Sequence, residues 1–336
     1  MSQAGGRDSQ SIDSKLKNQM PAVGIDLGGT KLSAAVVVDC KVVSEPRTVP
    51  TPHGPQNIVG ALIHLIRQFQ AEYTLAGVGI ATAGIVNVDT GDIIGSTGNL
   101  PGWAGTPLKS LIESKTMLPV LVDNDANAAA YGDTLALGLA HTKCVVGVTL
   151  GTGIGTGIVI DGKPYRGGNW GAGECGHMRI SLDNKRLCTC GLFDCWEAYG
   201  AGRGLVATCK ELLQGISAEQ TPLAADVDNL HTRTIVAAAQ QGDIIAQKAL
   251  NIYHGHVAQG LANLAHVLNP NCFVLSGGMS KVVDFDLLRE KFVDLTMEKS
   301  HEKVMIELSP LGDFAGIVGV AQCAIDAVLP KTASIR

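Results

Sequence analysis

Length, composition and charge exclude several kinds of protein. The chain has 336 residues, a formal net charge of −5, 46% hydrophobic and 17% charged residues, and 41 glycines. This length exceeds one ordinary hydrophobic core, so we expect two lobes. The mildly acidic balance gives no electrostatic reason to expect nucleic acid or a membrane surface as a partner. No apolar run reaches the roughly 18 residues that a membrane-spanning helix needs.

The chain begins with a polar stretch that has neither the apolar core nor the cleavage site of a secretion signal. We therefore expect residues 1–20 to form a disordered tail and the protein to be cytoplasmic.

A first α/β lobe is predicted over 21–139, and it opens with a hairpin. Residues 22–43 contain two strands rich in β-branched residues, joined by a Gly-Gly-Thr turn. The expected elements that follow are a helix over 55–72, a strand over 76–86, a capped helix over 106–115, a strand over 119–123 and an Ala-rich helix over 124–138.

A second lobe is predicted over 140–316, because the pattern begins again with a strand, glycine turn and strand over 144–163. Its other expected elements are helices over 196–213 and 229–268, a strand over 272–278, a helix near 284–299 and a strand near 303–308. A helix begins near 313, and its part over about 317–330 is assigned to the first lobe. Two α/β halves with similar openings imply a duplicated fold that binds ligands in a cleft between lobes.

Both hairpin turns are candidates for binding phosphate. They read DLGGTK (26–31) and TLGTGIGTG (149–157). Glycine lets backbone amides approach oxyanions, and Thr30, Thr152 and Thr156 add hydroxyl donors. Neither turn has the spacing of a Walker loop or the strand-to-helix position of a dinucleotide fingerprint. One such turn would be ordinary as often as functional, but two at the heads of similar halves favour phosphate binding. Asp26 ends its strand at the turn and is placed to hold Mg²⁺ through water.

Three further segments carry polar chemistry. In LVDNDANAAAYG, Asp123 and Asp125 lie two residues apart at a strand end. They either cap the following helix, or one acid faces the cleft while the other braces the backbone. The Ser-Gly-Gly after the strand near 272–276 is either a plain turn or a flat platform for adenine. Of nine cysteines only Cys188, Cys190 and Cys195 cluster, which favours a metal site over a disulfide in the cytosol.

The order DLGGTK, DNDAN, TLGTGIGTG, ECGH, C-x-C-x4-C-x-E and LSGG resembles the ROK family (repressor, open reading frame, kinase), over residues 22 to about 328. This family belongs to the actin-like, hexokinase-like ATPase superfamily. The resemblance implies a two-lobed α/β fold of duplicated ribonuclease H-like domains with an active-site cleft between the lobes, and a homodimer.

The resemblance also implies roles for individual residues. Asp125 would be the catalytic base that takes the proton from the sugar 6-hydroxyl, and Asn124 would hold a neighbouring hydroxyl. The implied sugar-binding residues are Gly84, Asn99, Asn124, Asp125, Glu174, His177 and Glu197. The implied residues for ATP and Mg²⁺ are Asp26, Gly28, Gly29, Thr30, Lys31, Gly151, Thr152, Gly153, Gly155, Gly277 and Gly278.

The resemblance implies one structural Zn²⁺ within 177–195, with His177, Cys188, Cys190 and Cys195 as its closed set of ligands. The chain departs from the family pattern at two positions here. Asp194 replaces the second glycine of C-x-C-G-x-x-G-C, and we expect it to keep the left-handed backbone of that glycine. Ala201 replaces a frequent serine, which removes a polar contact near the sugar.

The leading hypothesis is therefore an ATP-dependent hexose kinase of glucokinase type, because GNLPGW and DNDANAAAYG resemble ROK glucokinases. N-acetylglucosamine or N-acetylmannosamine kinase is the alternative, since GE-x-GHMR and C-x-E-x-Y also occur there. Polyphosphate is an alternative donor in relatives. The rival from another class is a sugar-responsive regulator, but only about twenty polar residues precede the first strand, without a basic patch.

Overall fold

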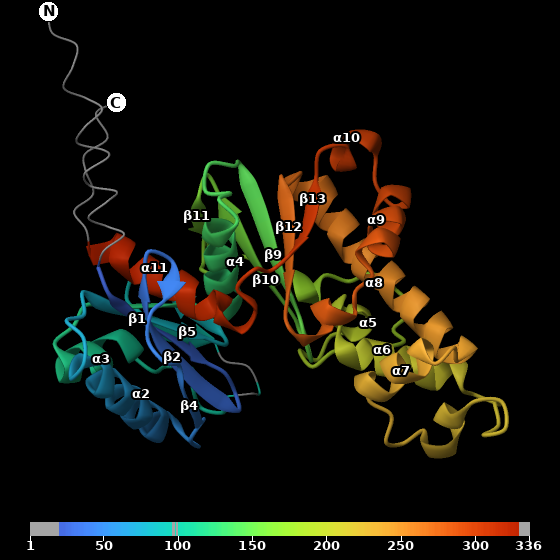
Figure 1. The fold of residues 1–336 in the computed structure, drawn as a ribbon, viewed down its shortest axis with the longest axis horizontal. Coiled ribbons are helices and arrows are strands. Elements are labelled where there is room, and N and C mark those ends of the chain that lie inside the picture. Colours follow the sequence, from blue (N-terminus) through green and yellow to red (C-terminus); the bar gives the residue numbers. More distant parts are fainter. Residues whose placement is uncertain (1–19, 96–97, 99, 329–336) are drawn as a thin grey trace, which may run out of the picture. The chain divides into compact units, whose positions relative to one another are not determined.

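The computed structural model describes residues 20–95, 98 and 100–328, which form two compact units (Figure 1). Unit 1 contains the described residues up to Ala140, Gly162–Ala172 and those from Asp313 onward, and unit 2 contains His141–Asp161 and Gly173–Gly312. The sequence prediction ran the second lobe from 140 to 316 without interruption, whereas here residues 162–172 belong to unit 1. Residues 1–19 of the predicted tail lie outside the described residues.

Unit 1 is built on a mixed sheet in the order β3-β2-β1-β5-β8, with β4 paired to β2. The hairpin of β1 and β2 is antiparallel, whereas β1, β5 and β8 are parallel. The strands are β1 (Ala22–Leu27), β2 (Lys31–Val38), β3 (Lys41–Val42), β4 (Arg47–Pro50), β5 (Gly77–Thr82) and β8 (Val120–Asn124). A separate antiparallel pair is β6 (Ile85–Asn87) and β7 (Asp92–Gly95), and β11 (Lys163–Tyr165) lies against α4 (Asp125–Ala136).

The two faces of this sheet are covered differently. Alternate side chains such as Val23 and Ile25 pack with α2 (Pro55–Gln70) and α3 (Leu108–Thr116) in one apolar core. On the other face, α11 (Ala315–Val328) contacts β1 and β5 and packs on α4. A Cβ atom at Gly24 or Gly79 would lie 2.1 Å from a carbonyl oxygen of α11, so only glycine permits this approach.

Unit 2 repeats the strand pattern in the order β10-β9-β12-β13. Its hairpin is again antiparallel, and β9, β12 and β13 are parallel. The strands are β9 (Cys144–Leu150), β10 (Ile154–Ile160), β12 (Cys272–Ser276) and β13 (Met305–Leu308). The helices are α5 (Glu197–Gly200), α6 (Gly202–Leu212), α7 (Thr232–Gln240), α8 (Ile244–Leu268), α9 (Phe285–Asp294) and α10 (Glu298–His301), with short 3₁₀ turns at 175–177, 222–226 and 278–282.

Several predicted elements are divided in the structure. The expected helix over 196–213 is broken at Ala201, which is extended, and the one over 229–268 stops before Asp243, which caps α8 through the Ala246 amide. The expected strand over 76–86 ends at Thr82 because Gly84 has a φ of 103°. The predicted cap of α3 is absent, since Pro107 holds the N-cap position without a side-chain hydrogen bond. No helix in the described part of the chain is long and apolar enough to cross a membrane.

Candidate active site and metal cluster

Asp125 is the first residue of α4, directly after β8. Its half-buried carboxylate accepts a hydrogen bond from the Ala126 amide at 2.8 Å. Burial raises the pKa of Asp125, against the opposing hydrogen bonds from the Ala126 amide and Asn124. The carboxylate is therefore a stronger proton acceptor than an ordinary surface aspartate, provided that it is ionised.

Asn124 is the N-cap of α4. Its side-chain oxygen accepts from the amides of Ala126 and Asn127, and its side-chain nitrogen donates to the carbonyl of Gly84 at 3.1 Å. The cap expected at this strand end is thus confirmed and belongs to Asn124. The structure thus joins Gly84 and Asn124, two of the implied sugar-binding residues, by a hydrogen bond.

Asp123 braces this strand end from the interior. Its side chain is 1% exposed, and one oxygen accepts from the Asn124 amide at 2.8 Å. The other oxygen accepts two hydrogen bonds from Arg166, at 2.6 Å and 3.0 Å. One acid of the pair was expected to brace the backbone, and it is Asp123. Sequence reasoning missed Arg166, which lies 43 residues away in a segment with no motif.

Asp26 lies near Asp125 in unit 1. Burial raises the pKa of Asp26 to about 6, and the charges of Asp125 and Asp313 add to the effect while Lys31 opposes it. The site adjoins the start of α11, where a Cβ at Gly316 would lie 3.8 Å from the Asp26 carboxyl carbon. Three carboxylates in one region are hard oxygen donors, which fit Mg²⁺. Asp313 was not foreseen, because the sequence shows it only as a residue before a helix.

The first glycine turn is fixed from behind by Thr51. The Thr51 hydroxyl donates to the Gly28 carbonyl at 2.7 Å and its amide donates to the Thr30 carbonyl at 3.0 Å. The Gly28 amide donates to Lys31 across the turn at 3.0 Å. Gly29, Thr30 and Lys31 are exposed. The turn is thus held in shape while its outer edge stays accessible.

The second glycine turn is also closed on itself, since the Gly151 amide donates to the Gly153 carbonyl at 3.0 Å. Thr152 at its tip is exposed. Thr156, expected as a phosphate donor, is buried and turned away: its hydroxyl donates to the Gly173 carbonyl and accepts from the Cys175 amide at 3.2 Å. The expectation for Thr156 was wrong, because the alternation of β10 directs that side chain into the protein.

The Ser-Gly-Gly segment lies at the end of β12. The Ser276 and Thr149 hydroxyls are 3.1 Å apart, and a Cβ at Gly277 would lie 2.4 Å from the Leu150 carbonyl oxygen. Gly277 has a φ of 83°, and Gly278 begins the 3₁₀ turn over 278–282. The segment therefore packs against the second hairpin, and its contact with adenine stays a prediction.

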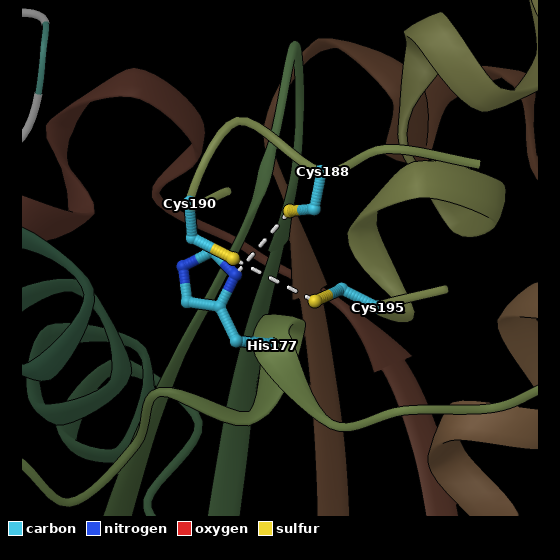
Figure 2. A group of neighbouring side chains, drawn as sticks. All are labelled: His177, Cys188, Cys190 and Cys195. Carbon is cyan, nitrogen blue, oxygen red and sulfur yellow. Dashed lines mark hydrogen bonds between the residues drawn. The ribbon is translucent and has the colours of Figure 1, made fainter. Parts of the chain in front are cut away.

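His177, Cys188, Cys190 and Cys195 form the cluster in Figure 2, with their donor atoms within 4.8 Å of one another. The Cys190 and Cys195 sulfurs are 3.7 Å apart, and the Cys188 sulfur lies 3.6 Å from His177 Nδ1. Zn–S bonds are about 2.3 Å, so two sulfurs on a tetrahedral zinc lie about 3.8 Å apart. All nine cysteines lie in the described residues as free thiols. The donor types and spacings thus fit zinc.

Glu174 lies near the imidazole nitrogen of His177 that faces away from the cysteines. His177 Nε2 is 3.8 Å from the Glu174 carboxylate, and both side chains are partly exposed. The ring thus offers Nδ1 to the cluster and Nε2 toward Glu174. Asn99, another of the implied sugar-binding residues, lies outside the described residues.

Glu197, which the resemblance implies as a sugar ligand, is buried, and its contact with sugar stays a prediction. It is 8% exposed and accepts hydrogen bonds from the Ile154 amide at 3.0 Å and the Thr189 hydroxyl at 2.9 Å. Arg203 pairs with it at 2.5 Å. None of these partners was foreseen, since no local pattern joins them.

Asp194 has the left-handed backbone expected of it, with a φ of 60°. Its carboxylate also accepts from the Arg186 amide at 2.9 Å, the Lys185 amide at 3.1 Å and the Tyr199 hydroxyl at 2.7 Å. Burial opposes its charge, but these hydrogen bonds hold the pKa of Asp194 below its usual value. The aspartate thus replaces glycine with a side chain that ties the cysteine loop to α5. Ala201 is buried at the start of α6 and provides no side-chain cap.

The ROK family model matches residues 22–327. The chain belongs to the ROK family. A glucokinase from Streptomyces coelicolor is 35% identical over 90% of this chain and 96% of its own length. An N-acetyl-D-glucosamine kinase from Salmonella paratyphi B is 28% identical over 89% and 97%. A ROK family glucokinase from Streptomyces griseus, crystallised with glucose and AMPPNP, is 32% identical with a TM-score of 0.76, covering 91% of this chain and 99% of that one.

These matches confirm the resemblance drawn from the motifs and the hexokinase-like α/β fold. They also make this ROK protein a sugar kinase. The roles of its individual residues toward sugar, nucleotide and metal stay predictions.

Proposed function

We propose that this ROK kinase transfers the γ-phosphate of ATP to the 6-hydroxyl of glucose. The observation that carries the proposal is Asp125, an acid with a raised pKa at the first residue of α4, fixed by the Asn124 cap and close to Asp26. The similarity to glucokinases from two Streptomyces species supports glucose and ATP.

Each part of the site has one task in this reaction. Asp125 accepts the hydroxyl proton as the oxygen attacks phosphorus, and the proton stays on its carboxylate until the product leaves. The exposed tips of the two glycine turns, Gly29–Thr30 and Thr152, would present backbone amides to the phosphates. Mg²⁺ supplies positive charge to the phosphate oxygens, and Asp26 would hold it through water. Glu174 and His177 accept and donate hydrogen bonds to the sugar hydroxyls.

The proposal is tested with purified protein and four sugars: glucose, mannose, N-acetylglucosamine and N-acetylmannosamine. The rate of ADP release is measured as each is titrated. We expect the highest kcat/KM with glucose. The Salmonella relative is named an N-acetyl-D-glucosamine kinase. A higher kcat/KM with N-acetylglucosamine would therefore show that this sugar, and not glucose, is the substrate, and the protein would still be a sugar kinase. Polyphosphate in place of ATP, in the same assay with product sugar phosphate measured, decides the donor.

We further propose that His177 and the three clustered cysteines hold one structural zinc ion. The support is the donor set and its spacing. Four protein ligands complete a tetrahedron, so the zinc would shape the loop 177–195 without taking part in the chemistry.

Metal analysis should find one zinc per chain, and Cys190→Ser should lose both the zinc and most of the sugar affinity. Cys40→Ser, a cysteine of unit 1 outside the cluster, serves as the matched control. Normal sugar binding by the zinc-free protein would refute the link between metal and sugar site.

A further inference from the structure

The carboxylate of Glu197 lies between two parts of the proposed machinery. Its Oε2 accepts the Ile154 amide at 3.0 Å, directly after the glycine turn, and its Oε1 accepts the Thr189 hydroxyl at 2.9 Å, between two cysteines of the cluster. The Cys188 sulfur is 3.5 Å from Oε1. One buried carboxylate thus contacts both the phosphate-binding turn and the metal loop.

The glycine turn is shaped around this carboxylate. A Cβ atom at Gly153 would lie 2.4 Å from Glu197 Oε2 and 3.1 Å from the carboxyl carbon. Any other residue at 153 would therefore displace either the turn or the carboxylate. The position of Glu197 and the conformation of residues 151–154 depend on each other.

Arg203 holds Glu197 in this position. Its Nη2 is 2.5 Å from Glu197 Oε1 and 3.4 Å from the Cys188 sulfur, so one guanidinium nitrogen donates to both. A zinc ion at the cluster would hold Cys188 as a thiolate, and the positive charge of Arg203 would then offset the repulsion between this thiolate and the carboxylate. The Nε atom of Arg203 is buried without a partner among the described residues. These two acceptors thus orient the side chain and leave its Nε–H unpaired within the described part of the chain.

We propose that Arg203 is a positioning residue that links the metal cluster to the glycine turn through Glu197. Metal bound at the cluster fixes the Cys188 sulfur, Arg203 transmits that position to the carboxylate, and the carboxylate fixes the Ile154 amide. Zinc binding thereby sets the conformation of the second glycine turn (151–155) as well as the position of His177, a proposed sugar ligand. Of the two tests below, only the measurement of the KM for ATP rests on the proposed function.

The first test is hydrogen exchange of the peptide covering 151–157, with and without removal of zinc by a chelator. In the native protein, chelation should speed exchange of this peptide at least about tenfold, because the Ile154 amide loses its acceptor. In Arg203→Gln the peptide should exchange fast already, and chelation should add little. An equal response to chelation in both proteins would overturn the proposal.

The second test separates binding from chemistry. Arg203→Gln should raise the KM for ATP about tenfold with kcat within about threefold, and should release zinc to a chelator faster. Arg203→Lys keeps the charge and should recover part of the ATP affinity. Arg233→Gln, an exposed arginine on α7, is the matched control and should match the native protein. An unchanged KM together with unchanged exchange would refute the role of Arg203.

The two tests also distinguish a failure of the proposed function from a failure of the coupling through Arg203. If the protein proves not to use ATP, the exchange result still decides the coupling between metal cluster and turn. Circular dichroism and melting of each variant show that it is folded, and Arg203→Lys remains informative if Arg203→Gln is not.

Discussion

The hairpins that open the two units are alike in topology and differ in chemistry. In each, an antiparallel pair is followed by two parallel strands, in the orders β2-β1-β5-β8 and β10-β9-β12-β13. The strand register allows the two hairpins to be compared residue by residue. Asp26 pairs with Ser33 one step before the turn, and Thr149 pairs with Gly155 at the same step.

The difference concerns where each hairpin finds its carboxylate. In unit 1 the acid belongs to the strand itself, and burial beside Asp125 raises the pKa of Asp26 to about 6. In unit 2 the corresponding Thr149 lies 3.1 Å from Ser276, and the acid comes from α5 as Glu197. A duplicated fold can thus keep its backbone while one hairpin carries its own carboxylate and the other accepts one from a helix.

The largest expected effect comes from Asp125, the acid with no counterpart in unit 2. Asp125→Asn should lower kcat by about 10³-fold, since general base catalysis contributes about 10² to 10⁴ and the amide cannot accept the proton. The ADP-release assay measures this, with zinc content and melting temperature unchanged. Asp89→Asn, an exposed aspartate of unit 1, should retain full activity. Substantial turnover by Asp125→Asn would exclude it as the base.

Arg166 is next, because it pairs with a carboxylate that is 1% exposed. Arg166→Gln should lower the free energy of unfolding by about 3 kcal/mol, as removal of one partner leaves a buried charge unpaired. Chemical denaturation measures the loss. Asp123→Asn in the same background should recover part of it by removing that charge, and a purely additive double variant would contradict the pairing.

Asp26 allows a prediction about pH. Its pKa in the folded protein, about 6, exceeds its ordinary 3.8, so the protonated acid stabilises the fold at low pH. That contribution is present below pH 4 and is lost as the pH rises through 6; at neutral pH and without ligand, Asp26→Asn should be more stable by roughly 2 kcal/mol.

The same variant should be a poorer kinase and should gain less stability than the native protein from Mg²⁺ with a non-hydrolysable ATP analogue. Melting curves from pH 3.5 to 7.5, with and without that ligand, measure both effects. A stability difference that does not change across this range would contradict the assignment.

The smallest effect is expected at Thr149, the counterpart of Asp26. Thr149→Val removes its hydroxyl contact with Ser276 and should cost about 1 kcal/mol of stability, the same at every pH. An effect that depends on pH would show that the two hairpins are chemically more alike than their residues indicate.

Sequence reasoning predicted the local geometry that neighbouring residues fix by themselves. The glycine turns, the cap and acid at 124–125 and the one-His, three-Cys cluster are each readable within one or two short segments. It failed for partners brought together by the tertiary fold, such as Arg166 with Asp123 and Glu197 with Ile154, which are 43 residues apart in each case. It also misassigned Thr156, because a hydroxyl in a glycine-rich turn looks alike whether it faces solvent or the interior.

The packing of α11 on the first sheet has a consequence for biosynthesis. The glycines at 24 and 79 meet a helix formed by residues 315–328, which the ribosome produces after every element of unit 2. Until that helix has emerged, one face of β1 and β5 lacks most of its cover, although all the strands of its sheet were synthesised long before. Unit 1 therefore completes its core after unit 2 has been translated, and the nascent chain must keep an apolar sheet face from aggregating throughout.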